Sequence, residues 1–113
     1  MSIVVSKQEN GDLGIKHNSG KPPLSWIPRA ALVAEAQVLA HGALKYERDN
    51  WKKGLPWSEV LDASLRHIYA FVDGEDMDEE SGLHHLAHAR CELGFLLEFA
   101  DTHPELDDRG SKA

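Results

Sequence analysis

The sequence has little cysteine, little positive charge and no long apolar run. Cys91 is the only cysteine among 113 residues, which excludes an intramolecular disulfide and a zinc site built from thiolates and is typical of a reducing compartment. We expect its thiol to be buried. No apolar run approaches the roughly 20 residues of a membrane span, and the N-terminus lacks a signal-peptide pattern. The sequence therefore predicts a cytoplasmic protein with no membrane partner.

Charge and missing motifs exclude several function classes. The chain has 19 acidic and 12 basic residues, a net charge of −7, which argues against a partner of duplex nucleic acid. It contains no G-x-x-x-x-G-K-[ST], G-x-G-x-x-G or G-x-S-x-G element and no His-Asp dipeptide. P-loop enzymes, dinucleotide-binding domains, serine hydrolases of the nucleophile-elbow type and histidine-aspartate phosphohydrolases are thereby excluded.

The chain length and residue pattern indicate one helical domain. Residues 1–20 are polar and punctuated by glycine, and residues 104–113 are charged and without periodicity, so we expect both ends to be flexible. Residues 21–103 show helical spacing and no strand pairs, which predicts an all-α fold. One domain of this size gains considerably from oligomerisation.

Three helices are expected, over 28–45, 58–72 and 81–101. Pro28 favours a first turn, Ser58 is a good N-cap, and Asp73-Gly74 favours a helix end. The residues predicted to be buried are Leu32, Ala36, Leu39 and Ala43 in the first helix, Leu61, Leu65, Ile68 and Val72 in the second, and Leu86, Ala89, Leu93, Leu96, Leu97 and Ala100 in the third. Apolar area around Trp26, Trp51, Trp57, Phe95 and Phe99 would remain uncovered, which favours a homodimer or tetramer.

The segment from Gly74 to His88 carries the strongest chemical signal. Five carboxylates fall within six residues, from Glu75 to Glu80, and His84, His85 and His88 follow at once. Clustered carboxylates repel one another unless cations, donors or water neutralise them, and histidines add metal ligands or proton carriers. The alternative interpretation of this segment is a solvent-exposed acidic loop without a binding role. We favour a site for a hard divalent metal bound through oxygen.

Glu35 is the only charge on the expected inner face of the first helix. A buried carboxylate requires a metal, a cationic partner or a proton. A structural ion pair with Arg66 or Arg90 is the alternative to a functional role. Glu35 with Glu75, Asp78 and Glu80 could form an oxygen-rich site, which would suit magnesium bridging to a nucleotide.

The spacing of the histidines predicts a stripe along one helix face and does not define a complete set of metal ligands. His85 and His88 share a helix face with Ser81 and Glu92 and are expected to line a cleft, which His67 could face. His84 and His88 at i, i+4 could hold zinc, but no third ligand accompanies them. Each histidine, taken singly, is more often a hydrogen-bonded structural residue.

Basic and aromatic residues supply candidates for nucleotide recognition. Trp51 could stack on a base while Asn50 reads its edge, or Trp51 could cap the core. Arg66 could instead pair with Asp62 on the helix surface. The candidate phosphate neutralisers are Lys21, Lys45, Lys52, Lys53 and Arg66.

A set of short motifs, read in order, resembles one phage protein family. They are Gly20-Lys21-Pro22, Trp26-Ile27-Pro28, Gly42-Ala43-x-Lys45-Tyr46, Asn50-Trp51, Gly54, Arg66-His67, Gly74-Glu75 and Asp78-x-Glu80-Ser81-Gly82-x-x-His85-Leu86-Ala87-His88-Ala89. From about Gly20 to Glu98 the chain is similar to the dATP/dGTP diphosphohydrolase N-terminal family. The resemblance implies a MazG-like, all-α, usually oligomeric pyrophosphohydrolase that acts in the host cytoplasm.

The resemblance also implies roles for single residues. Magnesium or manganese would be held by Glu35, Glu75, Asp78 and Glu80. On its expected burial, we assign to Glu35 the orientation of the attacking water. Lys21, Lys45 and Arg66 would hold phosphates, Asn50 and Trp51 would hold the nucleoside, and His85 and His88 would also contact substrate. MazG-type enzymes carry a second glutamate where this chain has Val38, so one metal-side carboxylate is missing.

Two functions from different classes follow, with a third ranked last. The first is metal-dependent hydrolysis of purine deoxynucleoside triphosphates, dGTP or dATP, to monophosphate and pyrophosphate. The second is a phage nucleotide-binding protein that sequesters an immune signalling nucleotide without turnover, which the missing carboxylate favours. The third is a structural, zinc-stabilised helical protein.

Overall fold

The computed structural model describes residues 13–17 and 19–110. This part of the chain forms the helices α1 (Arg29–Lys45), α2 (Trp57–Val72) and α3 (His85–Thr102). Three 3-10 turns, Leu24–Trp26, Asn50–Lys53 and Pro104–Leu106, accompany them. The described residues contain one isolated β-bridge, between Met77 and His84, and no strand. The predicted all-α class is confirmed. The expectations for residues 1–12, 18 and 111–113 lie outside the described residues.

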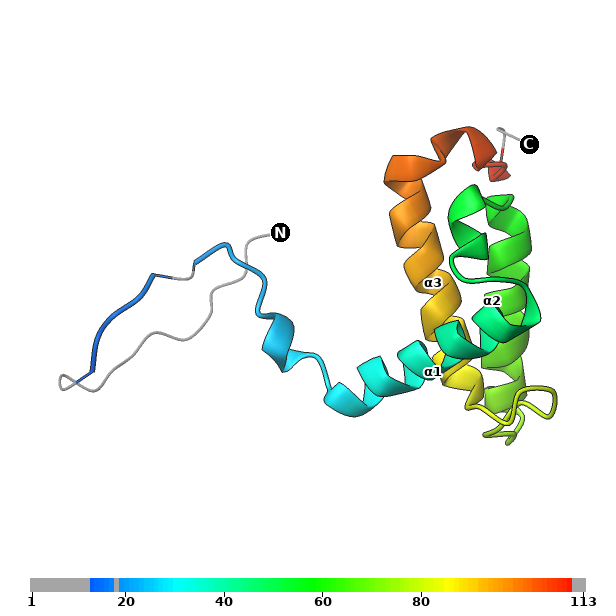
Figure 1. The fold of residues 1–113 in the computed structure, drawn as a ribbon, viewed down its shortest axis with the longest axis horizontal. Helices are drawn as coiled ribbons and strands as arrows, with labels where there is room; N and C mark the ends of the chain where they lie inside the picture. Colours follow the sequence, from blue (N-terminus) through cyan, green and yellow to red (C-terminus); the bar gives the residue numbers. More distant parts are fainter. Residues whose placement is uncertain (1–12, 18, 111–113) are drawn as a thin grey trace.

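The third helix is the centre of the bundle. α2 and α3 lie side by side, and α1 crosses them near the beginning of α3 (Figure 1). α1 and α2 each pack mainly on α3. The segment before α1 leads away from the helices (Figure 1), and Lys21 within it is exposed.

Two small apolar clusters hold the helices together. Val38 of α1 packs with Ala87 and Cys91 of α3. Trp57 and Val60 of α2 pack with Phe99, which is fully buried. Phe95 packs against both clusters. The large side chains of α3 therefore connect α1 to α2.

The face of α2 that packs inward differs from the predicted one. Trp57, Val60 and Ser64 are buried, whereas Leu65 is 43% and Val72 70% exposed. The helix has two neighbouring stripes of helical spacing, and α3 packs on the stripe that contains a serine and His67. The serine is accommodated because its hydroxyl donates to the carbonyl of Val60 one turn earlier. Ser58 is also not the N-cap, which is Pro56.

The inner faces of α1 and α3 need a similar correction. Val38 is the buried residue of α1, while Leu32 and Leu39 are 45% and 40% exposed. α3 begins at His85, four residues later than predicted, because residues 81–84 belong to a tight turn. The buried residues of α3 are His85, Ala87, Ala89, Cys91 and Phe99. Leu86, Leu93 and Leu97 are exposed, and of the predicted set only Ala89 is buried.

Residues 104–110, which belong to the tail predicted from the sequence, pack on the beginning of α2. Ser58 donates its amide and its hydroxyl to the carboxylate of Asp108, at 2.9 and 2.6 Å. Leu106 joins the Trp57 cluster, and the guanidinium of Arg109 lies 4.8 Å from the Trp57 ring centre. The segment thereby closes the open end of the α2–α3 pair.

The apolar area left uncovered lies only in part where the sequence placed it. Trp57 and Phe99 are buried, and only Trp26, at 60% exposure, remains strongly exposed among the aromatic residues named above. Aliphatic side chains are exposed instead on all three helices, for example Leu44, Val72 and Leu97. Among the described residues, no helix is long and apolar enough to span a membrane.

Candidate functional site

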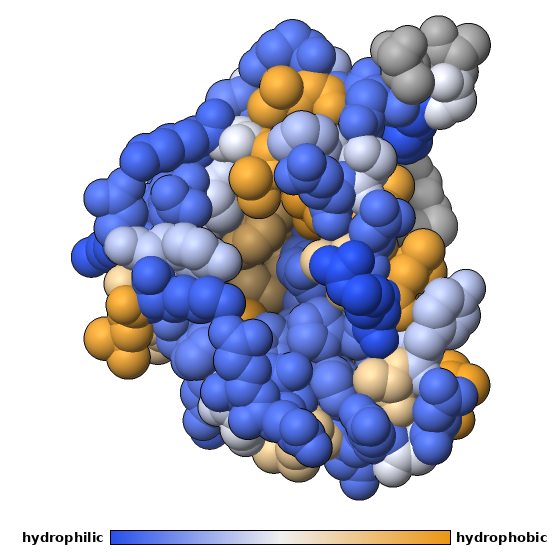
Figure 2. Space-filling model, turned by 90° about the vertical axis from the view of Figure 1, so that its right-hand side faces the viewer, coloured by the Kyte–Doolittle hydropathy of each residue, from blue (hydrophilic) through white to orange (hydrophobic). Residues whose placement is uncertain are grey.

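A cleft of about 680 Å³ lies between α1 and the α2–α3 pair. One wall consists of α1 from Val38 to Lys45 and of the segment from Tyr46 to Lys52. The other wall is formed by α2, α3 and the loop between them, and its polar lining residues are His67, Asp78, Glu80, His88 and Glu92. Basic and aromatic groups thus face acids and imidazoles across one space. Figure 2 shows one face of the molecule, hydrophilic over most of its area, with a hollow whose floor is hydrophobic.

The loop between α2 and α3 is closed by its own hydrogen bonds. The amide of Asp78 donates to the carbonyl of Leu83, the amide of Gly82 to the carbonyl of Asp78, and the amide of His85 to the carbonyl of Asp76, each at 2.8 Å. Gly82 has φ +71°, a left-handed conformation that favours glycine. Residues 76–85 therefore form a turn of fixed shape, which holds Asp78 beside α3.

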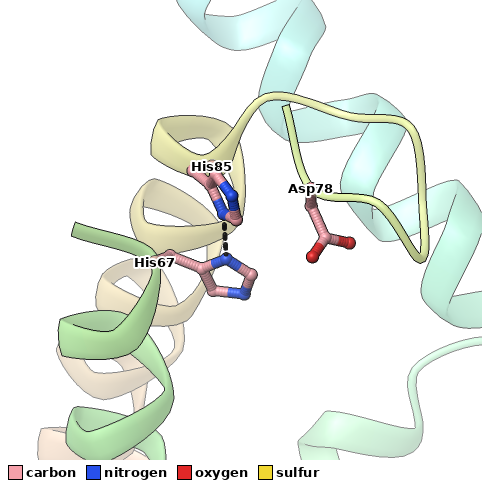
Figure 3. A group of neighbouring side chains, drawn as sticks. All are labelled: His67, Asp78 and His85. Carbon is pink, nitrogen blue, oxygen red and sulfur yellow. Dashed lines mark hydrogen bonds between the residues drawn. The ribbon is translucent and has the colours of Figure 1, made fainter. Parts of the chain in front are cut away.

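Three imidazoles meet where this loop joins α3. Nδ1 of His67 lies 2.8 Å from Nδ1 of His85, so one of the two nitrogens must carry the proton of a hydrogen bond. His67 also stacks on His88, with ring centres 4.5 Å apart and planes at 8°. His67 faces the stripe of α3 as predicted. Figure 3 shows His67 on α2, His85 in the first turn of α3 and Asp78 on the loop around one space.

Ser81 links His88 to Asp78. Its hydroxyl accepts from the amide of Leu83 and lies 2.7 Å from Nε2 of His88, to which it can donate its hydrogen. Its amide donates to Asp78 at 2.9 Å. Asp78 lies 3.8 Å from Nε2 of His88. The acid and the imidazole are thus held together by one serine, a role that sequence analysis had not assigned to Ser81.

Burial lowers the pKa of two of these imidazoles, those of His67 and His88. Desolvation, followed by repulsion from His88 and His85, lowers the pKa of His67. Desolvation also lowers the pKa of His88, although Asp78 opposes the shift. Burial acts to raise the pKa of Asp78, but hydrogen bonds from Ser81 and attraction to His88 outweigh it and lower that pKa. The lowered pKa values favour neutral rings for His67 and His88 beside an ionised Asp78.

Glu92 is a partly buried acid of the cleft, a property that the sequence had suggested for Glu35. One of its carboxylate oxygens is buried without a hydrogen-bond partner, and desolvation raises its pKa to about 7 although Arg66 opposes this. Nε2 of His67 lies 3.9 Å from the Glu92 carboxylate. Glu92 can therefore hold or release a proton near neutral pH beside the imidazole cluster.

Glu35 adopts the ion pair that sequence analysis held open as the alternative. Its carboxylate accepts a hydrogen bond of 2.8 Å from Nε of Arg90, which ties α1 to α3. It is not among the residues that line the cleft. The metal and water-orienting roles predicted for Glu35 remain predictions, and its observed contact is structural.

The other predicted metal-side acids are dispersed. Glu80 forms an ion pair of 2.6 Å with Lys45 across the cleft. Glu75 is 68% exposed, and its carboxylate lies 3.4 Å from Nε2 of His85. Asp78 is the acid that enters the histidine cluster. The structure therefore brings Asp78 and Glu75 to the imidazoles and leaves Glu35 and Glu80 paired with basic residues.

The predicted nucleoside and phosphate residues divide between the cleft and other places. Asn50, Trp51, Lys45 and Lys52 line the cleft. One face of Trp51 stacks on Phe95, with ring centres 4.4 Å apart and planes at 12°, so the residue supports the core and borders the cleft at once. The remaining candidates lie elsewhere: Arg66 lines a separate hollow beside Glu92, Lys53 pairs with Glu47, and Lys21 is on the N-terminal segment.

The comparison with known protein families supplies the decisive observation. The model of the family described as dATP/dGTP diphosphohydrolase, N-terminal, matches residues 12–109. The chain belongs to this family. It is also 44% identical over 96 residues to a protein of Salmonella phage PMBT28 named dATP/dGTP diphosphohydrolase. That match covers 85% of this chain and 33% of the phage protein. No solved structure matches the chain significantly.

The family match fits the motifs that the sequence displayed. The matched range contains all three helices, the loop before α3 and residues 104–109 that close the bundle. The chain spans about a third of the length of the curated relative. The structural parts described above therefore belong to the amino-terminal family region, whereas the relative's name describes a much longer protein.

Proposed function

We propose that this chain binds purine deoxynucleoside triphosphates in the 680 Å³ cleft and takes part in their metal-dependent hydrolysis to monophosphate and pyrophosphate. The observation that carries the proposal is the cleft's division into two chemical walls. Lys45, Lys52, Asn50 and Trp51 offer cations, an amide and an aromatic ring on one side. Asp78, His88 and Glu92 offer proton acceptors on the other.

The basic wall suits a triphosphate and a base. Lys45 and Lys52 would neutralise phosphate charge, and Asn50 would bond to a base edge beside the ring of Trp51. The Nζ atom of Lys52 lies 5.9 Å from the Trp51 ring centre, so cation and ring are close enough to contact one nucleotide. Lys45 would exchange its contact with Glu80 for a phosphate. The family name and the name of the phage relative agree with a substrate of this class.

The acidic wall can position and deprotonate water. Asp78 is ionised, is held in place by Ser81, and lies within 3.8 Å of His88. Either side chain can accept the proton of a water that attacks phosphorus. Glu92, whose pKa is about 7, is a further proton acceptor at the same wall. We assign the base role to Asp78, because its carboxylate is kept charged.

Magnesium or manganese fits this cleft as part of the substrate. A magnesium nucleotide needs only one or two protein carboxylates, the remaining ligands being phosphates and water. Asp78, with Glu75 nearby, supplies that number, whereas a cage of Glu35, Glu75, Asp78 and Glu80 is not assembled because two of the four acids pair with basic side chains. The metal would neutralise the pyrophosphate leaving group and lower the pKa of bound water.

A second candidate function is nucleotide capture without turnover. The dispersal of Glu35 and Glu80 into ion pairs favours it, because fewer acids remain for catalysis than a MazG-type enzyme employs. In that case the same basic and aromatic wall would hold an immune signalling nucleotide, and the ligand would leave unchanged.

Product analysis separates the two candidates. The purified chain is incubated with dGTP or dATP, with magnesium or manganese and with EDTA, and the products are separated by chromatography. Monophosphate and pyrophosphate formed only with metal support the enzyme. Intact nucleotide directs the search to cyclic and dinucleotide signals and to capture.

A matched pair of variants ties turnover to the cleft. Asp78→Asn keeps the size of the side chain and removes the charge, and we expect at least a roughly hundredfold loss of kcat because general-base catalysis contributes that much. Asp73→Asn, in the turn that ends α2, changes charge by the same amount outside the cleft and should leave the rate within about twofold. Equal rates in both variants would show that Asp78 does not take part in the reaction.

A further inference from the structure

We infer that His67, Asp78 and His85 form a binding site for one divalent transition-metal ion of the zinc and iron class. One nitrogen of each imidazole and one carboxylate oxygen lie within 4.8 Å of one another. The three side chains come from three different elements, α2, the loop and α3 (Figure 3). This site shares Asp78 with the proposed magnesium nucleotide, but its two imidazole ligands distinguish it, and metal binding there does not require a nucleotide.

An unsatisfied nitrogen gives independent support for a ligand at this place. His85 is 6% exposed, and its Nε2 atom is buried without a hydrogen-bond partner. Glu75 lies 3.4 Å from that nitrogen without completing a hydrogen bond. A buried polar group that lacks a partner destabilises the folded state. With a metal on Nδ1 of His85, Nε2 would carry the ring proton and could donate it to the Glu75 carboxylate after a small movement, so metal binding would remove this destabilisation.

The short contact between the imidazoles of His67 and His85 is close to the spacing of two imidazoles bound to one metal ion. Nδ1 of His67 and Nδ1 of His85 are 2.8 Å apart and share one proton. Two imidazole nitrogens bound to zinc at about 2.0–2.1 Å in tetrahedral geometry are about 3.4 Å apart. A metal could thus replace the shared proton after the rings separate by a few tenths of an ångström. Small side-chain rotations are sufficient for this.

The donor set determines the class of metal. Two imidazoles and one carboxylate are the ligands of catalytic zinc sites and of non-haem iron sites, which keep a position open for water or substrate. Magnesium requires oxygen ligands and binds imidazole poorly. His67 and Asp78 also line the cleft, so the open position of the ion would face the space where a ligand enters.

The surrounding residues form the supporting shell that metal ligands require. Asp78 is fixed by the amide of Ser81, and His67 is stacked on His88. His88 is itself engaged with the hydroxyl of Ser81, which leaves it a supporting residue and not a ligand. Such outer contacts orient ligands before the metal binds.

Titration with cobalt tests the inference without any nucleotide. The full chain, treated with a chelator and dialysed, is titrated with Co²⁺, and the visible ligand-field absorption and the heat of binding are recorded. We expect one equivalent to bind, Zn²⁺ to displace it, and a large excess of Mg²⁺ to leave it in place. A wild-type chain that binds no Co²⁺, or one from which Mg²⁺ displaces Co²⁺ at equal concentration, would overturn the inference.

Three variants assign the ligands. His67→Ala and Asp78→Asn should each lower the affinity for Co²⁺ at least about a hundredfold, because loss of a ligand exceeds the 10–100-fold effect of an outer-shell change. His41→Ala is the control, since His41 lies on α1 with its ring edge-on to His88 at 6.4 Å. Its affinity should stay within twofold. An equal loss in His41→Ala, or unchanged affinity in the other two, would show a hydrogen-bonded histidine pair and no metal site. Circular dichroism of each variant confirms that it is folded, and failure of nucleotide hydrolysis would not alter any of these readings.

Discussion

Burial changes the chemistry of single side chains in this small core, and Cys91 is a clear example. Its thiol is 3% exposed and packs with Val38 and Ala87. Burial, together with the nearby charges of Glu35 and Glu92, raises its pKa to about 12. The sequence prediction of a buried thiol is confirmed, and its raised pKa leads to a test of accessibility.

We predict that Cys91 does not react with a thiol reagent while the chain is folded. Thiolate is the reactive form, and with a pKa of about 12 very little of it is present at pH 8. Reaction with an aromatic disulfide at pH 8 should be at least about a hundredfold slower than in urea. The single cysteine makes the signal unambiguous. Rapid stoichiometric reaction without urea would contradict the described packing.

Phe99 and Leu97 provide a second test at the residue scale. Phe99 is fully buried, whereas Leu97, two positions earlier, is 78% exposed. We predict that Phe99→Ala lowers the free energy of unfolding by about 3–5 kcal/mol, measured by urea denaturation. Leu97→Ala should change it by less than about 1 kcal/mol. If Phe99→Ala leaves no folded chain, Phe99→Leu gives a smaller loss of the same sign. Equal effects of the two alanine variants would contradict the described packing of α3, in which Phe99 is buried and Leu97 is exposed.

At the scale of elements, the packing of residues 104–110 on α2 depends on Asp108. Its carboxylate accepts two hydrogen bonds from Ser58, and the side-chain bond, followed by the backbone bond, lowers the pKa of Asp108 below the ordinary 3.8. A carboxyl group with a lowered pKa in the folded state stabilises that state above its unfolded pKa. This contribution is lost as the pH falls through the folded value. The docked segment should therefore persist at pH 4 and loosen only at lower pH.

The amide resonance of Ser58 measures this docking. We predict that its chemical shift titrates with a midpoint below pH 3.8 in the wild-type chain and does not titrate in Asp108→Asn. In that variant one amide oxygen can still accept from Ser58, but no proton is exchanged. A midpoint at or above the ordinary value for aspartate would mean that the two hydrogen bonds do not form in solution.

The elements show which features the sequence could predict. The extent of α1 and α2 follows from proline before each helix and Asp73-Gly74 after the second, and these signals are local. The predicted inner face of α2 was wrong because this helix has two neighbouring stripes of equal spacing. Packing against α3 selects one of them, and the sequence of α2 alone does not determine which. α3 begins four residues later than predicted because a turn precedes it. The sequence does not reveal the backbone hydrogen bonds of Asp78 and Gly82 that form this turn.

The candidate site was predictable in part for the same reason. The facing of His67 and the stripe of α3 followed from helical spacing, and the structure places them together. The partners of Glu35 and Glu80 depended on how α1 crosses α3, which spacing does not determine. Arg90 and Lys45 are therefore found where metal had been expected.

For the whole molecule, exposed aliphatic side chains indicate association with a second copy. Leu44, Val72 and Leu97 are 89%, 70% and 78% exposed, and a three-helix core of this size leaves such area uncovered. We predict a dimer or tetramer in solution by light scattering. Leu97→Glu should shift the chain toward monomer, whereas Lys53→Glu, an equally exposed surface change, should not. A monomer at high concentration in the wild type would contradict this prediction.

The two neighbouring lysines of the Asn50–Lys53 turn provide a direct test of whether the cleft binds a nucleotide, as we propose. Lys52 lines the cleft, while Lys53 does not and pairs with Glu47. Calorimetric titration with a non-hydrolysable dGTP analogue and magnesium should show binding that Lys52→Ala weakens about tenfold, the equivalent of one charge-assisted hydrogen bond. Lys53→Ala should bind as the wild type does. No binding by the wild-type chain, or equal weakening by both variants, would contradict a nucleotide site in this cleft.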